Sequence, residues 1–270
     1  MNARERFAAA VNGPAADLRL DVAACAIAAR AHPGADIDEC LGRLDVLAAR
    51  CPDATFDALR VHLFENEGFR GNIDHYDEPE NSFLDSVLER RLGIPISLSV
   101  LMIEIGRRLG VDVRGVGMPG HFLVLDGARG DVWCDPFHGG ARLDIDGCRR
   151  RFDLVYGGSL VFQPSFLAPT PPAAIVARML ANLAHGKLAT DPVQLAWMCE
   201  LHLEIPGLAF QERWDLADRL AASGDLVLAA GVFESLAARA EAAVGQPGAP
   251  EPDVAARLRT RARALRARLN

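Results

Sequence analysis

The sequence predicts an α+β fold, in which a helix packs on an antiparallel sheet and further helices flank this core. Apolar residues recur at helical spacing before residue 110 and again after residue 172. Between these segments the period changes: from Val111 to Asp135 apolar residues alternate, as in short strands. Gly127–Gly130 has the composition of a turn between two of those strands.

The first 68 residues predict a small helical bundle. Each of three segments, around residues 20–28, 37–47 and 56–64, carries one apolar stripe. His32-Pro33-Gly34 ends the first segment, and Cys51-Pro52 follows the second. Because each stripe needs a partner surface, we expect the bundle over residues 1–68 to cover another layer.

Residues 69–168 predict the α+β core. A first helix is expected to start at Asn81 or Ser82, and Pro95 prevents its simple continuation. A second helix is expected over Ser97–Leu109. The strands expected after it are, in order, Val111–Gly115, Phe122–Leu125 and Val132–Asp135.

Residues 173–270 predict a C-terminal helical region. Leu167–Pro172 is rich in proline and has the composition of a linker. Helices are expected over about residues 174–189, 192–203, 210–222 and 226–242, and a basic helix ends the chain.

Composition excludes several classes of function. The chain has 36 acidic and 29 basic residues and a net charge of −7, which argues against a nucleic-acid partner. The sequence contains no apolar run of about eighteen residues, the length that a membrane span needs. The charged start MNARERF does not resemble a signal peptide. We therefore expect a cytoplasmic protein without membrane contact. Its six cysteines form no C-x-x-C pair, which is typical of buried, reduced thiols.

Three residues are candidates for a nucleophile, base and orienting acid. Ser97 opens the second core helix, and His121 and Asp135 lie on neighbouring predicted strands. A hairpin through Gly127–Gly130 would place position 121 opposite about 136, and a slip of one residue would place it opposite Asp135. Ser97 is also a plain candidate for a helix cap, and Ser99 is a weaker second nucleophile.

Two other arrangements are weighed against this set. Cys134 could replace the serine, but strand alternation should point its side chain away from Asp135. His121, Asp135 and His138 could instead hold a metal such as zinc. No sequence-local motif supports that site, so the prediction contains no metal and no cofactor.

The segments NSFLDSVLERRLGIPISLS, GRRLG, PGHFLV and CDPFHGG resemble the SirB-like branch of the transglutaminase-like superfamily. The resemblance implies a papain-like core, with His121 at the histidine place and Asp135 at the aspartate place. The place of the catalytic cysteine falls on Pro95, or on Ser97 after a two-residue shift. The helices around Ser223-Gly224-Asp225 resemble a tetratricopeptide unit.

Three functions follow as hypotheses. The first is an acyl-transfer or amide-hydrolysing enzyme that uses His121 and Asp135, with Ser97 or water as nucleophile. The second is a pseudoenzyme scaffold that binds a peptide or protein through the C-terminal helices. The third is a metal-dependent hydrolase. The retained pair of His121 and Asp135 favours the first.

Overall fold

The computed structural model describes residues 1–14, 18–243, 251 and 253–269. The chain divides into two compact units, Met1–Asn182 and Leu183–Asn270, and the division falls inside helix α8 (Pro172–His185). The three-part division drawn from the sequence stays a prediction. The α+β class is confirmed, because helices surround one four-stranded antiparallel sheet.

The N-terminal helices form as their apolar stripes predict. They are α1 (Ala3–Val11), α2 (Leu20–Ala31), α3 (Ile37–Arg50) and α4 (Phe56–Val61), and α4 runs on into a π-helical turn, His62–Asn66. Asp36 and Thr55 cap α3 and α4 by accepting from backbone N–H groups of the first turn. The apolar stripes are buried, and α3 packs against the core helix α6 (Pro95–Leu109).

Two predicted helix starts in the core are wrong by a few residues. Pro79–Ser82 forms a 3-10 turn, and α5 (Leu84–Arg90) begins after it. Helix α6 (Pro95–Leu109) begins at the proline, two residues before the predicted Ser97. Proline suits this position because its ring fixes φ and the first helical N–H needs no helical partner. A short parallel pair, β1 (Arg70–Gly71) and β2 (Leu92–Gly93), precedes α6.

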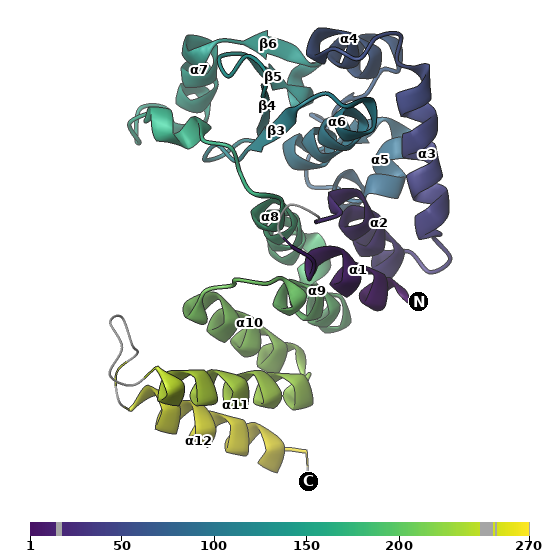
Figure 1. Cartoon of the computed structure of the whole chain (residues 1–270). Helices are drawn as coiled ribbons and strands as arrows, with labels where there is room; N and C mark the ends of the chain where they lie inside the picture. Colours follow the sequence, from purple (N-terminus) through teal and green to yellow (C-terminus); the bar gives the residue numbers. More distant parts are fainter. Residues whose placement is uncertain (15–17, 244–250, 252, 270) are drawn as a thin grey trace. The chain divides into compact units, whose positions relative to one another are not determined.

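The main sheet has the order β3-β4-β5-β6, and all its pairs are antiparallel. Its strands are β3 (Val113–Val116), β4 (Leu123–Asp126), β5 (Trp133–Asp135) and β6 (Ala141–Leu143). Helix α7 (Ile145–Tyr156) follows, and Figure 1 shows α6 and α7 on opposite sides of the sheet. Leu125, Trp133 and Phe152 belong to the apolar cluster on the α7 side. By strand alternation the neighbouring Cys134 faces the other side.

The segment Leu167–Pro172 is not a free linker. Leu167 is buried in the apolar cluster beside α7. The Thr170 N–H donates to the Gly115 carbonyl at 2.7 Å, and the Thr170 hydroxyl accepts from the Gly117 N–H at 2.8 Å. These bonds fasten the segment along β3, so its prolines stiffen a docked strap rather than separate two domains.

The second unit is helical, as the periodicity predicts. It contains α9 (Pro192–Glu204), α10 (Phe210–Ser223), α11 (Leu226–Ala242) and α12 (Val254–Ala267). Each of these helices packs against the next along the chain. Within the described part of the chain, no helix has the length and apolar character that crossing a bilayer requires.

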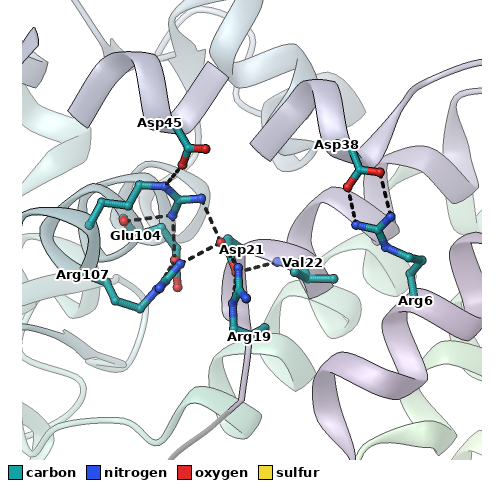
Figure 2. A network of polar contacts seen from close by, with 9 residues as sticks. Arg6, Arg19, Asp21, Val22, Asp38, Asp45, Glu104 and Arg107 are labelled. Atoms are coloured by element: carbon teal, nitrogen blue, oxygen red, sulfur yellow. Dashed lines mark hydrogen bonds and ion pairs between the residues drawn. The ribbon is translucent and has the colours of Figure 1, made fainter. Parts of the chain in front are cut away.

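A buried ionic network fastens the N-terminal helices to the core (Figure 2). Asp21 of α2 is fully buried and accepts from Arg19, from Arg107 Nη2 at 2.8 Å and from Arg108 Nη2 at 2.9 Å. Both latter arginines belong to α6 and also bind the buried Glu104. Burial would raise the pKa of Asp21, but the hydrogen bond from Arg19 and the other arginine charges lower it below its usual value.

We expect Asp21→Asn to destabilise the protein by about 3 kcal/mol at neutral pH, because it removes the fully buried anion that three arginines share. The lowered pKa of Asp21 means that its contribution is present above the unfolded-state value and lost as pH falls through the folded-state value. The difference in unfolding free energy between wild type and variant should therefore shrink below about pH 4. Urea denaturation across this pH range measures it.

Asp38→Asn is the matched control. Asp38 of α3 pairs with Arg6 of α1 at 2.6 Å, but its side chain is 70% exposed (Figure 2). Solvent screens such a pair, so little stability should be lost. Equal losses in both variants would contradict the importance assigned to the buried network.

Candidate active site

Asp135 is the centre of the candidate site. It ends β5, and its carboxylate is fully buried. Oδ1 accepts from His121 Nε2 at 3.0 Å and from the His138 N–H at 3.2 Å. Oδ2 accepts from His138 Nδ1 at 2.7 Å and pairs with Arg151 Nε at 3.0 Å. One carboxylate therefore joins the sheet, the turn after it and helix α7.

These donors decide the charge of Asp135. Burial by itself would raise the pKa of the carboxyl group, but the hydrogen bonds from His121 and His138 lower it well below its usual range. Asp135 is therefore ionised at neutral pH and can act only as an acceptor. Each imidazole must carry a hydrogen on the nitrogen that faces it.

The backbone around His121 fixes the ring's position. His121 follows the turn Pro119-Gly120, and its N–H donates to the Met118 carbonyl at 3.0 Å. Arg178 of α8 donates to the His121 carbonyl at 2.9 Å. Gly120 has φ = +72°, and a Cβ there would lie 2.6 Å from Val155 Cγ1. Only glycine fits this turn, so the sequence Pro-Gly-His is needed to deliver the imidazole.

The predicted contact between His121 and Asp135 is confirmed, but the predicted register is wrong. Val124 pairs with Cys134, whereas the expected register would have paired it with Trp133. His121 lies two residues before β4 begins, so it has no partner in the ladder. The contact forms because the Met118–His121 turn directs the ring towards the end of β5.

Each imidazole has one nitrogen left over. His121 Nδ1 and His138 Nε2 have no hydrogen-bond partner among the described residues. His121 is 8% exposed and His138 is about one-third exposed. Because its Nε2 holds the hydrogen facing Asp135, the His121 Nδ1 carries a lone pair. It can accept a proton from a small nucleophile beside it.

The structure does not join Ser97 to His121 by a hydrogen bond. Ser97 lies in the first turn of α6, and its hydroxyl donates to the Asn81 carbonyl at 2.6 Å. The same oxygen accepts from the Ile94 N–H at 3.1 Å. The side chain thus fastens the helix start to the preceding turn. Ser99, the weaker candidate, donates to the Pro95 carbonyl one helical turn back, at 2.7 Å.

Ser97 nevertheless belongs to the frame of the site. The Asn81 amide donates to the carbonyls of His75 and Tyr76, at 2.8 and 3.2 Å. The Tyr76 ring packs edge-on against Phe137, with centroids 5.7 Å apart, and Phe137 packs against His121 at 6.2 Å. The polar loop that carries Tyr76 is therefore held beside the His121–Asp135 pair.

Several residues of the site have little sequence signal. The sequence predicts His138 only as an alternative metal ligand, although its spacing of three from Asp135 in a proline-started turn allows the observed bond. Arg151 comes from α7, a helix that the apolar pattern does not separate from the sheet. Arg178 lies beyond the segment predicted to be a linker. For the last two, no local pattern points to the site.

The same groups could in principle hold a metal. One ligand atom from each of His121, Asp135 and His138 lies within 4.8 Å of the others. A metal would have to replace the hydrogens that now join both rings to the carboxylate. It would also lie close to Arg151, whose guanidinium already contacts Oδ2. The donor set is therefore better suited to hydrogen bonding than to a cation.

Together, the α6 start, the His121–Asp135 pair and the antiparallel sheet form one α+β unit. The family model described as the transglutaminase-like superfamily matches residues 22–181. That match covers more than half of the chain. The protein belongs to the transglutaminase-like superfamily.

Similar proteins support this membership but carry no activity in their names. A UPF0162 protein of Xylella fastidiosa (strain Temecula1) is 42% identical over 146 residues, which are 53% of this chain and 52% of that protein. A UPF0162 protein of Vibrio cholerae is 29% identical over 159 residues, 58% of each chain. Human F-box only protein 21 is 39% identical over 100 residues, 37% of this chain and 14% of that protein. The alignments thus span about half the length of the bacterial relatives.

Cys134 should be unreactive in the folded protein. It is fully buried, and burial raises the pKa of its thiol well above the usual value. We expect iodoacetamide to label Cys51, which is partly exposed, long before Cys134. Mass spectrometry of tryptic peptides over a time course measures both rates. Rapid labelling of Cys134 that His121→Ala prevents would instead indicate a cysteine nucleophile.

Proposed function

We propose that the protein is an acyl-bond hydrolase that activates water with His121. The observation that supports this most directly is the 3.0 Å bond from His121 Nε2 to Asp135, together with a second ring nitrogen that has no partner among the described residues. A buried, ionised aspartate fixes the imidazole tautomer and stabilises the imidazolium that forms during proton transfer.

The proposed reaction is the hydrolysis of an amide or ester. His121 Nδ1 takes a proton from water as the water oxygen bonds to the carbonyl carbon. The tetrahedral intermediate then expels the amine or alcohol, which takes that proton from His121, and a carboxylic acid remains. Asp135 keeps its charge throughout and holds the ring in place.

The start of α6 is a candidate site for the developing oxyanion. Gly71 pairs with Gly93 just before α6, and a Cβ at Gly71 would lie 2.5 Å from Phe137. The helix start therefore lies beside the Pro136–His138 turn. The first N–H groups of a helix have no helical partner and carry partial positive charge, which suits an anionic oxygen.

Water is preferred as nucleophile because the side chains near the cysteine place cannot easily serve. The ungapped alignment puts Pro95 there, which has no nucleophilic group. Ser97 remains the predicted side-chain alternative, but its one hydroxyl hydrogen is directed to Asn81. Cys134 lies on the other face of the sheet from Asp135 by strand alternation.

Acyl probes test the proposal. Purified wild type should hydrolyse a panel of p-nitrophenyl esters and aminocoumarin amides above background. His121→Ala and Asp135→Asn should each lose about a hundredfold or more in kcat, because base and orienting acid act as a unit. Ser97→Ala should keep most of the rate, since it removes a structural hydrogen bond and not the attacking atom.

Two outcomes would contradict the water mechanism. Turnover that survives His121→Ala would show that His121 is not the general base. Loss of all turnover in a folded Ser97→Ala protein would restore serine as the nucleophile. His75→Ala is the matched control, because this histidine lies in the loop beside the site and offers the Asn81 amide only its backbone carbonyl.

A second proposal is a scaffold role for the C-terminal helices. Helices α9 to α12 pack consecutively, as in arrays that hold peptides, and we infer a tetratricopeptide-like, protein-binding surface there. The SirB-like branch within the superfamily is likewise an inference from the motif NSFLDSVLERRLGIPISLS. A scaffold would show no probe turnover in wild type. Metal-dependent hydrolysis is the weakest alternative, because Arg151 lies against the carboxylate.

A further inference from the structure

A cavity in the first unit shares no residue with the His121 site. Its volume is about 510 Å³, and it lies among α3, the end of α5 and the segment that precedes β1. Its lining mixes apolar side chains with charged ones at the ends of the same elements. The size is within the range of small-molecule sites.

The apolar part of the cavity comes from four side chains. Leu47, Phe69 and Leu88 are buried, whereas Val46 is 50% exposed on α3. The exposed side chain of Val46 therefore offers apolar surface beside the buried residues, and an apolar ligand can cover it. The gain is roughly proportional to the apolar area removed from water.

Three arginines and two glutamates supply the charge. Glu67 is already neutralised, because Arg91 Nη2 lies 2.9 Å from its carboxylate and Arg50 lies 3.9 Å from it. Arg43 differs, since its one hydrogen bond to the described residues is a long one, 3.5 Å, to the Asp85 carbonyl. No carboxylate pairs with Arg43 among the described residues, so one guanidinium at the cavity is left to bind an anion.

The backbone at Arg91 supports a built cavity wall. Arg91 has φ = +59°, the only positive φ of a non-glycine residue in the described chain, at the end of α5. Glycine would adopt this conformation at lower cost. The arginine side chain lies over the Phe69 ring, 5.9 Å from its centroid, and binds Glu67. In this backbone conformation, Arg91 contacts both Phe69 and Glu67, which line the cavity.

We propose that this cavity binds a monocarboxylate with a flexible apolar chain, of the size of a medium-chain fatty acid. The apolar part of the lining has room for a chain of about eight to twelve carbons, and the guanidinium of Arg43 donates paired N–H groups to the carboxylate. A single unpaired cation favours a single negative charge over a phosphate dianion. The exposed Glu39, one helical turn before Arg43, would repel the same carboxylate.

Isothermal titration of the full-length protein with octanoate, below its micelle-forming concentration, tests the proposal. Saturable binding should be at least tenfold tighter for octanoate than for 1-octanol, which has the same chain without the charge. Arg43→Gln should weaken octanoate binding about tenfold and leave octanol binding unchanged. Glu39→Gln should tighten octanoate binding severalfold, because it removes the repelling charge.

Arg129→Gln is the matched control. This exposed arginine pairs with Asp131 in the turn after β4, and neither residue lines the cavity. It should bind octanoate like wild type, and thermal melting should show that all variants fold. Equal affinities for octanoate and octanol would overturn the charge recognition. An absence of saturable octanoate binding, or equal effects of Arg43→Gln and Arg129→Gln, would overturn the site itself. None of these results depends on hydrolysis by His121.

Discussion

The site depends on the hydrogen bonds and the ion pair that the buried carboxylate of Asp135 makes. A carboxylate with no exposure to water is costly unless its lone pairs are filled, and here two imidazoles, one guanidinium and one backbone N–H fill them. These donors come from the turn before β4, the turn after β5 and helix α7. Burying Asp135 therefore fixes three segments relative to one another, and His121 is orientated as a consequence.

The start of α6 is held by a local network of hydrogen bonds. Pro95 begins the helix, and Ser97 fastens it to the Asn81 carbonyl. Asn81 in turn holds the loop that presses Tyr76 against Phe137. The helix start is thus a structural junction beside the His121–Asp135 pair, and the structure gives His121 no hydrogen bond to Ser97. For this reason we propose water, and not a side chain, as the nucleophile.

The sequence was sufficient for the parts of the fold that local pattern determines. Apolar periodicity predicted most of the helices but not α7, and the Gly127–Gly130 turn predicted the hairpin. His121 and Asp135 were predicted because they lie on neighbouring predicted strands and because they fall at the histidine and aspartate places that the resemblance implies. The register failed because His121 lies outside the ladder, where the turn at Gly120 and its contact with Val155 decide its position. Arg151 could not be predicted, because it reaches Asp135 only through the tertiary packing of α7 on the sheet.

Nitrogen-15 NMR of histidine-labelled protein at slightly alkaline pH can determine the tautomer of His121, and so test whether this residue can act as the base. With Asp135 ionised, we predict that His121 carries its hydrogen on Nε2 and leaves Nδ1 unprotonated. His121→Gln assigns the signal, and Asp135→Asn should abolish the tautomer preference. A wild-type His121 with its hydrogen on Nδ1 would contradict the proposal, because the lone pair would then lie on Nε2, which faces Asp135, and Nδ1 could not accept a proton from water.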